Sequence, residues 1–280
     1  MSPRDEVLVS TDWVAAHVDD PSSVLVEVDE DAAAYENGHI RNAIAWHWRD
    51  ELHAHPRRDF VDQEEMVALL RRSGVGPDTT VVLYGGNNNW FATYAYWLLR
   101  YLGFDRVKLM DGGRKKWELE DRELVTEVPS RAPADPGPLV PVRHELRAFR
   151  DDVLGHVGRE GGSMVDVRSP AEFSGEVLAP PHLPQEQSQV GGHIPGAANV
   201  PWATAANEDG SFKDDDALRE IYGTVGVTPD TDVIAYCRIG ERSSHTWFVL
   251  HELLGYDRVR NYDGSWTEYG SLVGVPVERG

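Results

Sequence analysis

The two halves of the chain resemble each other, and this internal repeat is the feature that most constrains the fold. Four pairs of segments match, and they keep the same order in both halves. The pairs are VLVEVDE (24–30) with SMVDVRS (163–169), GHIRNAI (38–44) with GHIPGAA (192–198), TTVVLYGG (79–86) with TDVIAYCR (231–238), and LGFDRVKLMDGG (102–113) with LGYDRVRNYDGS (254–265). Ordered self-similarity of this kind indicates a duplicated domain.

A proline-rich stretch separates the two copies. The segment TEVPSRAPADPGPLVPV (126–142) holds five prolines and little apolar periodicity, which is typical of an extended linker. A chain of 280 residues is long enough for two domains with a core each. We therefore predict an N-terminal domain at 1–125, a linker at 126–143 and a C-terminal domain at 144–280, with a surface loop inserted into the second copy at 174–191.

Short β-rich runs alternate with longer helical segments in each copy. The predicted strands are 24–28, 81–84, 164–167 and 233–236, and the clearest helical segments are 64–74 and 245–255. Both helical segments end at Gly, as helices commonly do. Alternation of strand and helix predicts an α/β fold in which each domain is a parallel sheet flanked by helices. Ligands collect at the carboxyl ends of strands in such folds.

The only cysteine of the chain, Cys237, directly follows one of these predicted strands. We predict that a helix begins near Ser243, so that the thiol meets unpaired backbone N–H groups while Arg238 and Arg242 add positive charge. These surroundings favour the thiolate, which is the reactive form of cysteine. Glu241 opposes them, and we take its side chain to point outward. Cys237 is therefore the predicted catalytic nucleophile.

One copy serves as a control for the other, because features present in both are expected to serve the fold. The loop GGNNNW (85–90) of the first copy stands where the second has CRIGER (237–242). The first copy therefore lacks the thiol and both arginines, and we predict that it is catalytically silent. Its Gly85 stands opposite Cys237, and we expect it to need a positive φ, which glycine adopts readily.

Several residues occur in both copies. His39 and His193 lie in the GHI segments, and Tyr84 and Tyr236 end matching strands, so structural roles are predicted for all four. Arg168 occurs only in the second copy. Its position beside Asp166 allows either a substrate ligand or a structural ion pair.

The composition excludes several classes of function. The formal net charge of −20 argues against a nucleic-acid partner, because phosphate backbones are bound by excess Lys and Arg. No apolar run approaches the length of a membrane span, and the N-terminus lacks the pattern of a signal peptide. A single cysteine fits a reducing compartment and excludes a cysteine-rich metal site. We therefore expect a cytoplasmic protein without a membrane partner, a metal or a cofactor.

The segment YCRIGERSSHTW (236–247) carries a resemblance to a known family. Together with DVRSPAEF (166–173), GHIPGAANVPW (192–202) and NYDGSWTEYG (261–270), it makes the sequence similar to the tandem-domain rhodaneses, the thiosulfate sulfurtransferases, and above all to their actinobacterial branch. The resemblance covers nearly the whole chain, both copies and the linker.

The resemblance implies a role for each loop position. Cys237 attacks the outer sulfur of a small anionic donor, thiosulfate, and becomes a persulfide while sulfite leaves; cyanide or a thiol then takes the sulfur. Arg242 holds the sulfonate of the donor. The chain has no second cysteine, so the acceptor must be external. The other predicted substrate-binding residues are Arg238, Ile239, Gly240, Glu241, Ser243 and Arg168.

The chain departs from the pattern of animal rhodaneses at two positions, and we consider three alternative functions. Animal members of the family carry a lysine where this chain has Ile239 and an arginine where it has Glu172. The nearest alternative is a 3-mercaptopyruvate sulfurtransferase, whose loop typically has small residues after the cysteine. A cysteine phosphatase would have the spacing C-x5-R, whereas this loop has C-x4-R. A non-enzymatic sulfur-relay or binding module is the third alternative.

Overall fold

The structure is a computed structural model that describes residues 3–29, 31–54, 58–179 and 187–280. The chain divides into two compact units. One consists of Met1–His144 and Asn207–Phe212, the other of Glu145–Ala206 and Lys213–Gly280. Residues 180–186 of the predicted insertion lie outside the described residues. Within the described ranges, no helix is both long and apolar enough to cross a membrane.

The first unit contains a five-stranded parallel sheet with the order β1-β5-β4-β2-β3. Its strands are β1 Leu8–Val9, β2 Ser23–Asp29, β3 Ile44–His47, β4 Thr80–Tyr84 and β5 Val107–Met110. Its helices are α1 Pro3–Val7, α2 Thr11–His17, α3 Ala32–Asn37, α4 Trp48–Glu51, α5 Gln63–Arg72, α6 Gly86–Tyr101 and α7 Gly113–Leu119. The long helix α6 packs along β2, β4 and β5.

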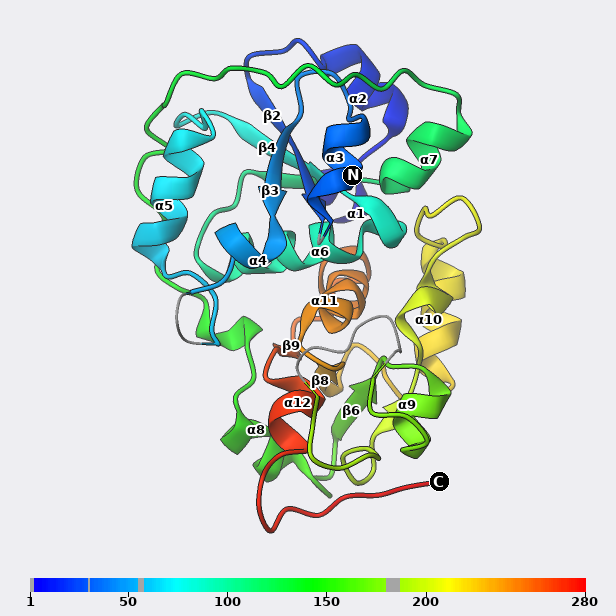
Figure 1. The fold of residues 1–280 in the computed structure, drawn as a ribbon. Helices are drawn as coiled ribbons and strands as arrows, with labels where there is room; N and C mark the ends of the chain where they lie inside the picture. Colours follow the sequence, from blue (N-terminus) through cyan, green and yellow to red (C-terminus); the bar gives the residue numbers. More distant parts are fainter. Residues whose placement is uncertain (1–2, 30, 55–57, 180–186) are drawn as a thin grey trace. The chain divides into compact units, whose positions relative to one another are not determined.

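The second unit contains a four-stranded parallel sheet with the order β7-β6-β8-β9. Its strands are β6 Gly162–Asp166, β7 Ala198–Asn199, β8 Asp232–Tyr236 and β9 Val259–Tyr262. Its helices are α8 Arg150–His156, α9 Pro170–Ser174, α10 Asp215–Gly223, α11 Glu241–Trp247 and α12 Ser265–Tyr269, with the π-helix η3 Phe248–Leu253 and the short 3₁₀ segment η2 Trp202–Ala205. The 3₁₀ segment η1 His144–Leu146 begins at the last residue of the first unit before the boundary. Figure 1 labels most of the helices and strands of each unit.

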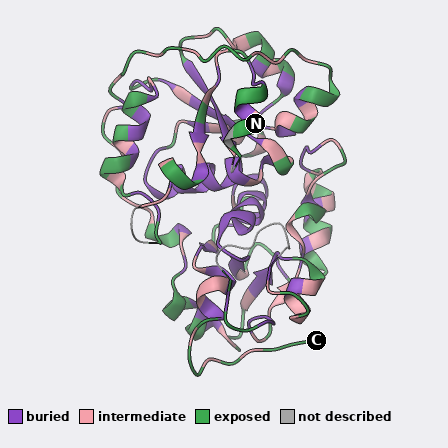
Figure 2. Ribbon diagram, in the orientation of Figure 1, coloured by how far each residue is buried: buried purple, intermediate pink, exposed green. Residues whose placement is uncertain are grey.

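The central strands of both sheets are buried, as Figure 2 shows in purple. Val24, Val26 and Val28 of β2 share one face of the strand, and all three are fully buried. Leu25 on the opposite face is also buried, which is expected of a parallel sheet covered by helices on both faces. The predicted α/β architecture with two parallel sheets is confirmed.

The helices also follow local signals in the sequence. α5 begins after Asp62, whose side chain accepts from Glu65 N while the Glu65 carboxylate accepts from Asp62 N, forming a capping box. α11 begins at Glu241, two residues before the predicted start near Ser243. The reason is Gly240, whose φ of 98° turns the chain directly from the loop into the helix.

Candidate active site

Cys237 lies at the carboxyl end of β8, which ends at Tyr236, so its predicted position is confirmed. The backbone of Cys237 is fixed by two hydrogen bonds to the start of α12. Cys237 N donates to Ser265 Oγ at 3.0 Å, and the Cys237 carbonyl accepts from Trp266 N at 3.1 Å. The sulfur therefore occupies a defined position at the edge of the sheet where parallel folds bind ligands.

A backbone amide points at the sulfur. Gly240 N donates to Cys237 Sγ at 3.1 Å. Gly240 has a positive φ, and a Cβ at this position would lie 2.4 Å from Asp263 Cα. Only glycine fits this turn, and the turn is what aims the amide at the sulfur.

Asn261 of β9 holds the loop in place together with Ser243 at the start of α11. Asn261 Nδ2 donates to the Gly240 carbonyl at 3.0 Å, and Ser243 Oγ donates to Asn261 Oδ1 at 2.6 Å. The sequence analysis did not single out Asn261 or Ser265. Comparison of the two copies could have identified both residues as specific to the second copy, because the first copy has Leu109 and Gly113 at these positions.

Glu241 points inward, so the prediction that its side chain points outward is wrong. It is buried, and Cys237 Sγ donates to Glu241 Oε2 with 3.6 Å between sulfur and oxygen. The early start of α11 explains this difference. Each helical residue turns by about 100°, so a start at Glu241 gives its side chain a different direction from the one assumed.

The pKa of the Cys237 thiol is raised, contrary to the prediction that its surroundings favour the thiolate. Burial is the largest cause, and the Glu241 carboxylate adds to it. Arg242 and the backbone amides of Ser243 and Gly240 act in the opposite direction without overcoming them. Burial likewise raises the pKa of Glu241, against the charges of Arg242 and Arg238. The two acids of the site thus both hold protons more tightly than in water.

Arg242 forms a two-point ion pair with Glu172. Its Nη1 and Nη2 donate to Glu172 Oε2 and Oε1, both at 2.9 Å, and both side chains are buried. Burial alone would raise the pKa of Glu172, but the Arg242 hydrogen bonds and charge, together with Ser169, lower it to about 2. Glu172 stands at one of the two positions where the chain departs from animal rhodaneses, and it neutralises the predicted sulfonate-binding cation.

Arg168 forms a buried ion pair with Asp166. Its Nε donates to Asp166 Oδ1 at 2.9 Å, and its Nη2 donates to the Gly192 carbonyl at 2.7 Å. The guanidinium lies 4.7 Å from the ring centre of Trp266. These contacts join β6 to the segment before β7 and favour the structural of the two interpretations of Arg168.

The remaining predicted site residues lie in the same loop and helix start. Arg238, Ile239 and Ser243 are all buried. The Arg238 carbonyl accepts from Thr267 N at 3.0 Å, and Ser243 Oγ lies 3.0 Å from the Gly240 carbonyl oxygen. The structure therefore gathers the loop residues around the sulfur, whereas Arg168 belongs to a neighbouring ion pair.

The equivalent loop of the first unit has the same backbone frame without the chemistry. The Gly85 carbonyl accepts from Arg114 N at 3.0 Å, as the Cys237 carbonyl accepts from Trp266 N. The expectation that Gly85 needs a positive φ is wrong, because its φ is −169°. Glycine is required for space instead: a Cβ there would lie 2.4 Å from the Val28 carbonyl oxygen.

The residues shared by both copies make matching structural contacts. Nδ1 of His39 donates to the Tyr35 carbonyl, and Nδ1 of His193 donates to the Phe173 carbonyl, both at 2.9 Å. Each imidazole also stacks on the ring of the same partner. Likewise, the hydroxyls of Tyr84 and Tyr236 each accept a backbone N–H of the GHI isoleucine at 3.1 Å. These contacts support the predicted structural roles.

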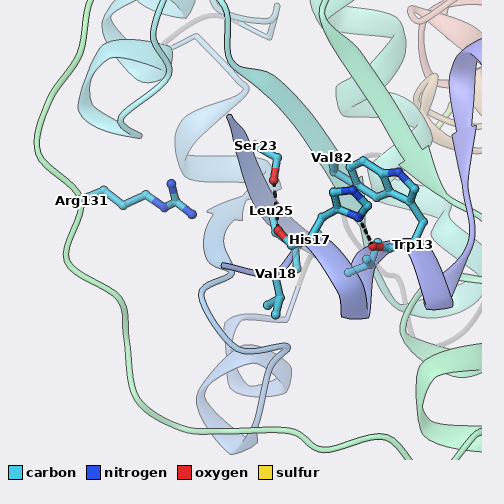
Figure 3. A pocket seen from close by; sticks show the side chains of 8 residues that line it. Trp13, His17, Val18, Ser23, Leu25, Val82 and Arg131 are labelled. Atoms are coloured by element: carbon cyan, nitrogen blue, oxygen red, sulfur yellow. Dashed lines mark hydrogen bonds between the residues drawn. The ribbon is translucent and has the colours of Figure 1, made fainter. Parts of the chain in front are cut away.

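A small cavity in the first unit is no rival site. It lies between α2 and β2, is lined by residues that include Trp13, His17, Leu25 and Arg131 (Figure 3), and has a volume of about 10 Å³. That is room for about one water molecule. In the part of the chain that the structure describes, no group of three or more His, Cys, Asp and Glu side chains is arranged to hold a metal ion.

Comparison with known proteins places this geometry in a family. A rhodanese-like domain matches residues 10–120 and 150–272. The "Putative thiosulfate sulfurtransferase" of Saccharopolyspora erythraea is 59% identical over 98% of this chain and 97% of its own length. The "Sulfur carrier protein TtuD" of Thermus thermophilus is 53% identical, again over 98% of this chain and 97% of its own length.

A solved structure agrees with these matches. The crystal structure of YnjE aligns with a TM-score of 0.86 and 26% identity, covering 99% of this chain and 69% of that one. The full-length relative from Saccharopolyspora also agrees with the predicted likeness to the actinobacterial branch. The chain therefore belongs to the rhodanese family, with two rhodanese-like domains in tandem.

Proposed function

We propose that the chain is a sulfurtransferase that moves the outer sulfur of thiosulfate to cyanide or a small thiol, with Cys237 carrying the sulfur as a persulfide. The observation that carries this proposal is the hydrogen bond from Gly240 N to Cys237 Sγ at the carboxyl end of β8. A fixed amide aimed at the reacting sulfur stabilises negative charge there without reorganisation during the reaction. The name of the Saccharopolyspora relative supports thiosulfate as the donor.

The reaction has two half-reactions that share the enzyme persulfide. In the first, the Cys237 thiolate forms a bond to the outer sulfur of thiosulfate, and the S–S bond of the donor breaks with its electron pair on the departing sulfite. In the second, the acceptor forms a bond to the transferred sulfur, and the electron pair of the Cys237–S bond returns to Sγ. We therefore expect ping-pong kinetics. Since Cys237 is buried, the site must open to admit the donor.

Arg242 and Arg238 supply the positive charge of the proposed donor site, and the backbone of Arg238, Ile239, Gly240, Glu241 and Ser243 forms its loop. Glu172 already engages Arg242, so little free positive charge remains for a dianion. This observation keeps 3-mercaptopyruvate, which carries a carboxylate instead of a sulfonate, as the second candidate donor. Steady-state kinetics with both donors distinguish the two activities.

The identity of the acceptor forms a separate part of the proposal. The name of the Thermus relative describes that protein as a sulfur carrier. In this chain the single cysteine requires an external acceptor, which can be cyanide, a small thiol or a protein thiol. We propose a thiol in a reducing, cytoplasmic setting, because one cysteine without a disulfide partner fits that compartment.

The two halves have different roles in this proposal. The domain at 144–280 performs the chemistry without metal or cofactor, the domain at 1–125 is catalytically silent, and 126–143 links them. The first unit supports this because Gly85 replaces the nucleophile and has no room for a Cβ beside the Val28 carbonyl oxygen.

Mass spectrometry of the intact protein tests the persulfide directly. Incubation with thiosulfate is expected to add the mass of one sulfur to the wild type, and cyanide is expected to remove it. Cys237→Ser is the control and is expected to gain no mass and to lose turnover. An unchanged wild-type mass, or sulfur transfer by Cys237→Ser, contradicts the proposal.

A further inference from the structure

Glu241 contacts the reacting atom of the proposed reaction. Its carboxylate lies 3.6 Å from Cys237 Sγ, and both side chains are buried. In the first copy the same position is Asn89, whose Oδ1 accepts from Gly85 N and serves the loop backbone. The carboxylate is thus specific to the copy that has the thiol.

The charged groups around Glu241 come from its own loop and from α9. Arg238 and Arg242 both attract its negative charge, and Glu172 accepts two hydrogen bonds from the Arg242 guanidinium. These two cations and two carboxylates balance, so one proton shared between Cys237 and Glu241 decides which of the two is anionic. The thiol of Cys237 donates to Glu241 in the structure, which sets the path for that proton.

The second half-reaction needs a proton on the transferred sulfur. When a thiolate takes the outer sulfur of thiosulfate, the product is the anion Cys–S–S⁻. An anionic terminal sulfur repels cyanide and thiolates, whereas the protonated form Cys–S–SH accepts their electron pair. The outer sulfur lies about 2 Å from Sγ, within reach of a carboxyl group that already contacts Sγ.

We propose that Glu241 is a catalytic residue that takes the proton of the Cys237 thiol and returns it to the outer sulfur of the persulfide. This inference rests on the proposed sulfurtransferase activity and assigns the proton transfers within it. In the first half-reaction the S–H proton moves to the Glu241 carboxylate, and sulfite leaves. The proton then moves to the outer sulfur. After the acceptor removes that sulfur, its proton returns through Glu241 to the Cys237 thiolate, which restores the starting state.

A Glu241 carboxylate that acted only through its negative charge would slow both half-reactions instead of assisting them. Its negative charge raises the pKa of the Cys237 thiol and repels an anionic acceptor. Its removal would then speed both half-reactions. A proton carrier, in contrast, is required for the second one, because the persulfide otherwise stays anionic.

Glu241→Gln separates these roles when the half-reactions are measured one at a time. Stopped-flow mixing with thiosulfate is expected to show persulfide formation that is slowed less than discharge, because solvent can take the thiol proton and the loss of the carboxylate charge lowers the pKa of Cys237. Discharge of the isolated persulfide by cyanide is expected to be about 100-fold slower or more, the usual size of a lost acid–base group. Glu252→Gln, on the π-helix that follows α11, is the matched control and is expected to keep both wild-type rates, since Glu252 contacts His251.

The outcomes distinguish this inference from the proposed function. Absence of a persulfide in the wild type contradicts the sulfurtransferase itself. A persulfide in Glu241→Gln that discharges at or above the wild-type rate overturns only the role of Glu241. If Glu241→Gln fails to fold, the wild type alone decides: its discharge is expected to be slower in D₂O, and equal rates in both solvents overturn the proposal.

Discussion

At the scale of single residues, the Glu172–Arg242 ion pair determines what a substitution of Arg242 would measure. The two side chains are buried, lie 70 positions apart in sequence, and share two hydrogen bonds. Removal of one partner from a buried pair leaves an uncompensated charge and commonly costs about 3 to 5 kcal/mol. Loss of activity in Arg242→Ala would therefore mix lost donor binding with lost stability.

The pKa of Glu172 predicts how the second unit responds to acid. Its folded-state pKa of about 2 lies below the ordinary 4.5, so the ionised carboxylate stabilises the fold above pH 4.5. This contribution, about 3 kcal/mol, is lost as the pH falls from about 4.5 to 2. Glu172→Gln is expected to be less stable than the wild type at pH 7, with a difference that shrinks across this range. Urea unfolding followed by tryptophan fluorescence at several pH values measures it.

An exposed carboxylate in the same region provides the control. Glu176 lies four residues after Glu172 and is exposed. Glu176→Gln is expected to follow the wild-type stability at every pH. A constant difference between Glu172→Gln and the wild type from pH 7 to pH 2 would contradict the assignment of the ion pair.

At the scale of elements, two versions of one strand–loop–helix unit show how the chain keeps a fold while changing its chemistry. In the first unit, Asn87, Asn88 and Asn89 all have positive φ and begin α6. Asparagine tolerates this left-handed conformation better than other residues that carry a side chain. In the second unit, Gly240 makes the single left-handed turn before α11.

The close packing of the first-unit loop against β2 predicts that a side chain at Gly85 is destabilising. A Cβ 2.4 Å from the Val28 carbonyl oxygen forces β2 and the loop apart, at a cost of about 1 to 3 kcal/mol. Gly85→Ala is expected to lower the melting temperature of the first unit while folded protein keeps its sulfur-transfer rate. Gly76→Ala is the control in the same unit, because its nearest neighbour would be the Thr79 hydroxyl at 3.3 Å. Loss of turnover in fully folded Gly85→Ala would mean that the first copy takes part in chemistry.

Comparison of the elements also shows which features the sequence could predict. The repeat, the strand runs and the position of Cys237 follow from local patterns, and the structure agrees with them. The direction of Glu241 does not, because it depends on the residue at which α11 begins. The pairing of Glu172 with Arg242 joins α9 to α11 across distant sequence, so neither segment alone reveals it.

At the scale of the whole molecule, the net charge of −20 acts on any anionic donor. Local attraction could overcome this field only if the loop carried free positive charge. Arg238 and Arg242 are opposed by Glu172 and Glu241, so the loop is close to neutral. A thiosulfate dianion therefore approaches a site that attracts it weakly, in a protein that repels it.

This balance predicts that salt accelerates the use of thiosulfate. Raising the ionic strength from 0.01 to 0.15 M shortens the screening length from about 30 Å to about 8 Å and weakens the long-range repulsion. The kcat/KM for thiosulfate is expected to rise by about twofold or more. The kcat/KM for 3-mercaptopyruvate is expected to rise less, because the field acts on fewer charges. Steady-state kinetics in an inert salt, with total acceptor fixed, measure both donors. A kcat/KM for thiosulfate that falls with salt would show that net positive charge at the loop governs donor binding, and that Arg242 is not neutralised by Glu172 as the structure indicates.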